Sequence, residues 1–219
     1  MKQWQCTICG YIHTGEEPPD ICPVCGADKS LFIELVEKNE ETPVTSQPES
    51  KEQAKNAEAS SSPELAPPPP APLFSYDGIT NLMLRHHAHP ISVHFPNGII
   101  PMAVTFIFLA VIFQFAGLSK ASFYNMVFVM LTLPAVLFTG YNEWKKKYKG
   151  ALTRIFVIKI VAAAIVSAGT LTSVLWFLIS PDVLQANSFE RTLFLTLQLV
   201  LVGATGIAGH IGGKLVFKD

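Results

Sequence analysis

Charge is scarce in this sequence, and the charges that are present nearly cancel. Asp, Glu, Lys and Arg together make up 15% of the residues, and the formal net charge is −1. A domain that binds nucleic acid normally carries a basic face, so this balance predicts no nucleic-acid partner. Hydrophobic residues make up 49% of the chain, although its first third is visibly polar. The mean hydropathy of +0.35 therefore averages over two unlike halves.

The first residues also lack the features of a secretory signal. The stretch MKQWQCTICG has no apolar h-region and no small-residue cleavage site, so we expect this segment to stay in the cytoplasm. Cysteine is absent beyond position 25, and the four cysteines all lie within the first 25 residues. In a reducing compartment, clustered cysteines indicate metal ligands rather than disulfides.

The cysteines form two C-x-x-C pairs, Cys6 with Cys9 and Cys22 with Cys25. Four thiolates can surround one Zn²⁺ or iron ion tetrahedrally. A glycine follows the second cysteine of each pair, and there it permits the positive-φ turn that directs backbone N–H groups toward the sulfurs. Spacing alone leaves open a structural zinc site, an iron centre and a redox-active dithiol pair, with zinc slightly ahead of iron.

The residues around the cysteines change this weighting. The stretch WQCTICGYIHTGEEPPDICPVCGADKSLF resembles the rubredoxin-like domain at the C-terminus of rubrerythrins. The resemblance implies that Cys6, Cys9, Cys22 and Cys25 hold one iron that cycles between its ferrous and ferric states. The di-iron half of a rubrerythrin needs several Glu and Glu-x-x-His motifs, and the apolar half of this chain has too few glutamates to supply them. Peroxidase activity of the rubrerythrin kind is therefore not expected.

A polar segment separates the cysteines from the apolar half. The stretch from 37 to 76 is rich in Glu, Ser, Pro and Ala and almost free of aromatic residues. Such a composition buries too little apolar surface to fold, so it predicts a disordered linker. We therefore divide the chain into a rubredoxin-like metal-binding domain at 1–36, a linker at 37–76 and a membrane domain at 77–219.

The membrane domain contains four long apolar runs, at about 91–116, 122–142, 155–179 and 192–217. Each run is long enough to cross a hydrocarbon core, which takes about 20 residues at helical rise. Shorter runs would also suit buried helices of a soluble protein, but four such runs in so short a stretch leave little room for that alternative. The sequence predicts an all-α four-helix transmembrane bundle, with the lipid bilayer as its first partner.

Positive charge gathers in one loop of this bundle. The connection between the second and third runs is basic, whereas the other connections carry little more than Lys120 and Arg191. The basic residues are Lys145, Lys146, Lys147, Lys149, Arg154 and Lys159. The positive-inside rule places this loop in the cytoplasm, together with both termini, so we expect a multi-pass protein of the cytoplasmic membrane. Trp144 and Tyr148, beside the lysines, are expected to lie in an interfacial aromatic belt.

The membrane half also carries a recognisable pattern. It opens with H-P-x-x-V-H-F-P and closes with a glycine-rich G-G-K-L-V run. In these features the stretch from about 85 to 217 resembles an uncharacterised family of small four-helix bacterial membrane proteins. Because that family has no settled activity, the resemblance implies an architecture and no function.

Two histidines in this half are candidates for cofactor ligands. His94 near the start of the first span and His210 near the end of the fourth are expected at similar depth, close to the cytoplasmic face. Gly206 and Gly203 precede His210 at one and two turns and would clear a flat slot beside it. With Lys214 available for a propionate, this pattern predicts a b-type haem with His94 and His210 as axial ligands.

Other interpretations of these histidines stay open. Glycines at such spacing often serve helix packing in membranes, and interfacial histidines often cap or hydrogen-bond the backbone, which would make the pair structural. A non-haem metal site would use His89, His94, His210 and Glu143. His87 and its neighbour His86 precede the membrane and are more typical of interfacial polar residues than of ligands.

These patterns together predict a membrane-anchored electron-transfer protein. A rubredoxin-type iron centre would exchange electrons with a b-type haem, or with a quinone, near the cytoplasmic face of the bundle. A cytoplasmic redox protein would be its partner, and a homo-oligomer is compatible with the pattern. We expect a carrier rather than a complete enzyme, because no acid, base or nucleophile set can be identified. The alternative is a zinc-ribbon module that recruits a soluble protein to a bundle without redox chemistry.

Overall fold

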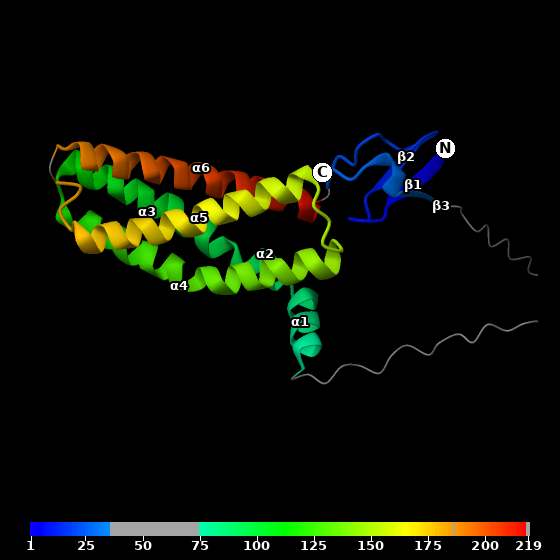
Figure 1. Ribbon diagram of the computed structural model, residues 1–219, viewed down its shortest axis with the longest axis horizontal. Helices are drawn as coiled ribbons and strands as arrows, with labels where there is room; N and C mark the ends of the chain where they lie inside the picture. Colours follow the sequence, from blue (N-terminus) through cyan, green and yellow to red (C-terminus); the bar gives the residue numbers. More distant parts are fainter. Residues whose placement is uncertain (36–74, 186, 218–219) are drawn as a thin grey trace, which may run out of the picture.

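The computed structural model describes residues 1–35, 75–185 and 187–217 (Figure 1). Two parts are present, a small strand-rich domain at the N-terminus and a bundle of long helices. This arrangement confirms the predicted fold class of a rubredoxin-like domain followed by a four-helix membrane bundle. The predicted linker lies outside the described residues except at its last two positions.

The N-terminal domain is built on a three-stranded antiparallel sheet in the order β2-β1-β3. Its strands are β1 (Lys2–Cys6), β2 (Ile12–Gly15) and β3 (Phe32–Leu35), and a short 3-10 helix, η1 (Lys29–Leu31), precedes β3. β1 pairs with β2 from Lys2 opposite Gly15 to Gln5 opposite Ile12. This register brings the end of β1, where the first cysteine lies, beside the loop that carries the second.

Two short helices lead into the bundle. α1 (Tyr76–Arg85) projects from the side of the bundle, and α2 (Ala88–Ser92) continues directly into the first long helix (Figure 1). Contacts with the second long helix hold α1 in place: the Tyr76 hydroxyl donates to Asn142 at 2.7 Å, and Lys146 pairs with Asp77 at 3.1 Å.

The four long helices are α3 (His94–Phe113), α4 (Ala116–Lys147), α5 (Arg154–Ile179) and α6 (Phe189–Phe217). Counting α2 as part of the first span, each is long and apolar enough to cross a membrane. α3 and α4 are joined by two residues only, of which Gln114 has a φ of 51°, and this tight turn forces the two helices to run antiparallel.

The bundle closes on itself, because α3 contacts α4, α4 contacts α5, α5 contacts α6 and α6 contacts α3. Its core is apolar and aromatic. The ring of Phe194 is fully buried and packs against Phe177 and Trp176, at centroid distances of 4.9 and 5.6 Å. About a third of each span is buried, and most of the remaining surface consists of large apolar side chains. Apolar side chains on the outside are what lipid requires.

Candidate metal centre and the histidines of the bundle

The four cysteines converge on one point of the N-terminal domain. Their sulfur atoms all lie within 4.8 Å of one another, with Cys6 Sγ 3.7 Å from Cys25 Sγ and Cys9 Sγ 3.6 Å from Cys22 Sγ. A tetrahedron with metal–sulfur bonds of about 2.3 Å has edges of about 3.8 Å. The sulfur cage therefore fits one iron or zinc ion. It is the only group of three or more His, Cys, Asp or Glu within metal-binding range in the described part of the chain.

The two knuckles that carry the cysteines have the backbone conformation that their glycines predict. Gly10 and Gly26 have φ angles of 72° and 71°, which residues with a Cβ adopt only at a cost. Each glycine N–H donates to the carbonyl of the first cysteine in its pair, at 2.9 Å in both knuckles. Each C-x-x-C-G segment is thus a closed turn that holds both sulfurs on the same side.

Electrostatics within the cage favour a bound cation. A hydrogen bond from the Cys25 thiol lowers the pKa of Cys22, because it stabilises the Cys22 thiolate. The same negative charge raises the pKa of both Cys9 and Cys25, whose thiols hydrogen-bond to Cys22. A cation at the centre of the cage would stabilise the thiolates of Cys9 and Cys25, whose pKa values are raised by the neighbouring Cys22.

The metal domain does not stand apart from the bundle. The second knuckle packs on the N-terminus of α5, where the Thr153 hydroxyl donates a hydrogen bond to the Cys25 carbonyl. A Cβ placed at Gly26 would lie 3.6 Å from the side chain of Ile155. Because Gly26 has no side chain, the backbone of the knuckle itself lies close to α5.

One hydrophobic cluster spans both parts of the chain. The metal domain contributes Val24, Ala27, Phe32 and three of the cysteines, and the bundle contributes Tyr148, Phe156 and Leu215. The Tyr148 ring is 5% exposed and lies 4.9 Å from the Phe156 ring, and its hydroxyl donates to the Leu215 carbonyl at 3.4 Å. Burial and the nearby Glu143, Cys9 and Cys25 raise the pKa of Tyr148. Tyr148 is therefore a buried contact residue between the two parts, and its place in an interfacial aromatic belt stays a prediction.

His94 and His210, the predicted axial pair, lie at the same end of neighbouring helices. The helices α3 and α6 approach each other closely near these histidines, because a Cβ placed at Gly209 would lie 3.1 Å from the side-chain nitrogen of Asn97. Both imidazoles are nevertheless exposed on the outer surface of the bundle. Gly203 and Gly206, the predicted slot, also face outward, and nothing lies within 4 Å of a Cβ placed at either.

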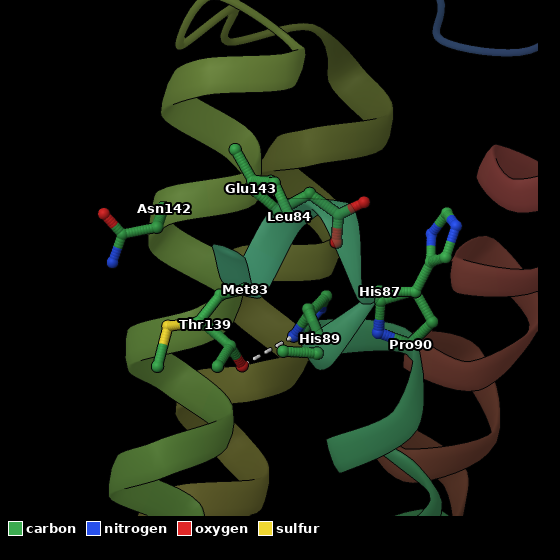
Figure 2. Close-up of a pocket in the computed structure, with 9 residues that line it drawn as sticks. Met83, Leu84, His87, His89, Pro90, Thr139, Asn142 and Glu143 are labelled. Carbon is green, nitrogen blue, oxygen red and sulfur yellow. Dashed lines mark hydrogen bonds between the residues drawn. The ribbon is translucent and has the colours of Figure 1, made fainter. Parts of the chain in front are cut away.

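His89, a secondary candidate, is instead packed inside. Its Nδ1 lies 3.4 Å from the Thr139 hydroxyl (Figure 2). A Cβ placed at Gly140 would lie 2.8 Å from the His89 ring, so the ring occupies the space that a side chain there would need. The adjacent cavity of about 10 Å³ is lined by His87, His89 and Glu143 among others, which is room for about one water molecule. Glu143 is 8% exposed and pairs with Lys147 at 3.2 Å.

The proposed non-haem metal set is not assembled. His89 and Glu143 line the small cavity, whereas His94 and His210 lie on the outer surface, and the four do not form a metal-binding group among the described residues. His87 is exposed and precedes α2 with a φ of 52°, and Lys214 is half-buried in the last turn of α6.

Comparison with known proteins accounts for most of the chain. Residues 85–219 match the family described as "Predicted membrane protein (DUF2231)". The chain belongs to this family. Residues 4–33 match "Rubrerythrin, rubredoxin-like domain". The four cysteines thus form a rubredoxin-like site for iron or zinc, fused to a DUF2231 membrane domain.

Individual rubrerythrins and rubredoxins match a short part of the chain. Reverse rubrerythrin-1 of Clostridium acetobutylicum is 52% identical over 40 residues, which are 18% of this chain and 22% of that protein. Rubredoxin-2 of Chlorobaculum tepidum is 40% identical over 52 residues, covering 16% of this chain and all of that protein. The chain thus spans about a fifth of the length of the rubrerythrin that it matches. No solved structure matches the chain significantly.

Two groups of residues escaped the sequence analysis. The contact between the knuckle and the bundle, at Thr153, Ile155 and Leu215, leaves no pattern in the sequence because it joins positions far apart in the chain. The ion pair of the buried Glu143 with the exposed Lys147 had a signal, since a carboxylate four residues before a lysine at the end of an apolar run predicts an ion pair on one helix face.

Replacing Cys22 by Ser should remove the metal and unfold the N-terminal domain. The domain has few core residues apart from its cysteines, and in small metal domains the free energy of metal binding is folding free energy. Metal content by mass spectrometry and domain protection by hydrogen exchange would measure both effects. The control is Lys29→Ala, which removes only an exposed ion pair with Glu17 and should leave both unchanged. A folded, metal-free Cys22→Ser domain would contradict the prediction.

Replacing Ile155 by Glu should separate the metal domain from the bundle without loss of metal. The new carboxylate would be buried against Gly26, and its desolvation should accelerate amide exchange in 148–156 and 211–217 by about tenfold or more. Leu152→Glu is the matched control, because Leu152 is 69% exposed in the same loop. Equal exchange in the two variants would show that the contact adds no stability.

Proposed function

We propose that this protein is a membrane-anchored electron carrier, in which the rubredoxin-like site exchanges single electrons with an acceptor held by the membrane bundle. The observation that supports this most directly is the packing of the second knuckle against the bundle. A domain that only recruits a soluble protein has no need to bury its metal-binding loop against its own membrane anchor. A carrier does, because its metal must come close to the next redox group.

Iron fits this role and this cage. Cys6, Cys9, Cys22 and Cys25 would hold it, and iron bound there would supply one-electron exchange between ferrous and ferric states. Three of the four cysteines are buried, and solvent exposure and N–H groups at the sulfurs are among the factors that set the reduction potential of iron–sulfur sites. The relatives named rubredoxin support iron over zinc by similarity of the domain.

The contacts suggest separate sides for donor and acceptor. Cys9 is the one half-buried cysteine, so the first knuckle leaves room for a cytoplasmic redox partner protein. The second knuckle lies on Tyr148 and Phe156, whose packed rings join the cage to the ends of α4, α5 and α6 in one hydrophobic cluster. No general acid, base or nucleophile enters this proposal, so the chain acts as a carrier and needs partner enzymes.

The identity of the acceptor is a separate question. The b-type haem on His94 and His210 stays a prediction, and it meets one difficulty in the geometry. A cofactor pocket normally buries most of its ligand, whereas both imidazoles and both slot glycines lie on the outer surface of the bundle. A haem there would lie against lipid or a second molecule, so we derive no step through it.

The visible spectrum of the purified, detergent-solubilised protein tests the carrier proposal. Iron bound to four thiolates should give charge-transfer bands that a reductant bleaches and air restores. Zinc alone, in a colourless protein from iron-replete cells, would contradict it and favour the recruitment module. A Soret band that disappears in both His94→Ala and His210→Ala, with the iron–thiolate bands unchanged, would add haem as the acceptor. His86→Ala is the matched control.

We also propose that the metal domain and the basic α4–α5 loop face the cytoplasm, as the positive-inside rule predicts. An impermeant amine reagent added to intact spheroplasts should label Lys120, which is exposed near the start of α4, and should not label Lys149, which is exposed in the basic loop at the other end. Peptide mass spectrometry measures both sites in one sample. Labelling of Lys149 but not Lys120 would reverse the orientation.

A further inference from the structure

We propose that the outer groove between α3 and α6 binds an isoprenoid quinone, with the quinone ring beside His94 and His210 and the tail along the groove. The groove has a volume of about 320 Å³ and is lined by Pro101, Thr105, Phe108, Leu199 and Val202 among others. That volume falls within the range of ligand pockets, about 300–1,000 Å³. The role of the quinone as electron acceptor rests on the proposed carrier function. Quinone binding itself does not, because it can be tested without electron transfer.

Helical geometry puts both histidines on the line of the groove. On α3, His94 and Gly98 precede Pro101 and Thr105 at positions i, i+4, i+7 and i+11, which share one face of a helix. On α6, Leu199, Val202, Gly206 and His210 stand at positions i, i+3, i+7 and i+11, which also share one face. The imidazoles therefore flank the cytoplasmic-end mouth of the groove, roughly 10 Å along the helix axis from its apolar part.

The space between the imidazoles and the apolar part is open. Nothing lies within 4 Å of a Cβ placed at Gly98 or Gly206, and both positions are exposed. A flat ring can therefore lie against the helix backbones there. Farther along, the groove presents no free polar group on Thr105, because its hydroxyl donates to the Pro101 carbonyl at 2.8 Å. The wall beyond the glycines suits an apolar tail.

The imidazoles of His94 and His210 at the end of the groove determine which head group the ligand can have. Neither the His94 nor the His210 imidazole has a hydrogen-bond partner among the residues that the structure describes, unlike the His89 imidazole, which lies beside Thr139. Uncompensated polar groups at membrane depth are costly and usually functional. A quinone has two carbonyl oxygens that accept from imidazole N–H groups, and an isoprenoid tail that fits an apolar groove open to lipid. A phospholipid would fill the groove but offers no flat ring for the glycine-cleared space.

The metal site approaches the same end of α6. Ile211 and Leu215, just after His210, pack in the cluster that contains the cysteines. In its last turns, α6 therefore packs one face against the metal domain and presents another, with His210, toward the end of the groove. A quinone ring at His210 would lie at the end of the bundle where the metal domain is held, which is the position that an electron acceptor requires.

The test uses the full-length, zinc-loaded protein in quinone-free nanodiscs, because zinc cannot exchange electrons. A photoreactive azidoquinone with a short isoprenoid tail should label peptides containing 94–109 and 199–210, and unlabelled quinone should compete. His94→Ala and His210→Ala should each lower labelling about fivefold, the effect expected for one hydrogen bond. Gly206→Leu should nearly abolish labelling by filling the space at the ring. Ala164→Leu, which enlarges an exposed side chain on α5, should have no effect.

Three results would overturn the assignment. Labelling spread evenly over the outer faces of α4 and α5, or unchanged in the histidine and Gly206 variants, would mean ordinary partition into lipid. Haem that co-purifies and is lost in the histidine variants would assign the imidazoles to iron. A dimer that Gly206→Leu converts to a monomer, without quinone labelling, would make the groove a helix-packing interface. Quinone binding by the zinc protein together with a redox-inactive iron form would refute the carrier function and leave the quinone site intact.

Discussion

The metal domain has too few apolar side chains to cover its own second knuckle, and the bundle supplies the rest. Val24, Ala27 and Phe32 are buried together with Tyr148 and Leu215 in one cluster. Small domains bury too small a fraction of their surface to be stable alone and usually need a metal or a partner surface. Here both are available, since the cysteines bind a metal and the knuckle packs on α5. The distance between the metal and the membrane is therefore a consequence of hydrophobic burial.

The bilayer imposes a second constraint, because polar groups in lipid need hydrogen-bond partners within the protein. The histidines of the bundle differ in whether they have such a partner. Several polar groups of the bundle are paired: His89 lies beside Thr139, Glu143 pairs with the exposed Lys147, and the Gln198 amide donates to Ser173 at 2.9 Å. These contacts are what a helix bundle in lipid needs for stability. The hydroxyls of Ser122 and Thr170 and the side-chain oxygen of Gln198 are buried without a partner among the described residues. His94 and His210 face outward with no such contact. The contacts of His89 are explained by helix packing, whereas the outward pair is where we propose that a quinone binds.

The last turns of α6 connect the two proposals physically. Successive residues there point to different sides, so that Ile211 and Leu215 pack toward the cysteines while His210 lies beside the groove. Gly209 allows α3 to approach at this level, because its missing side chain leaves room for Asn97. A short helical segment thus determines how close an electron acceptor can lie to the metal domain.

The sequence by itself determined the parts of this protein that depend on local pattern. Two C-x-x-C-G knuckles predicted the metal cage, because each closes its own turn through Gly10 or Gly26. Run length predicted four spanning helices, since hydrogen bonds within each helix satisfy its backbone in lipid. Only the tertiary structure decided that Tyr148 is buried under the metal domain and that His94 and His210 face outward. Those features depend on which faces of distant segments meet, and the apolar runs, hydrophobic nearly all round, leave the choice of face undetermined until the helices pack.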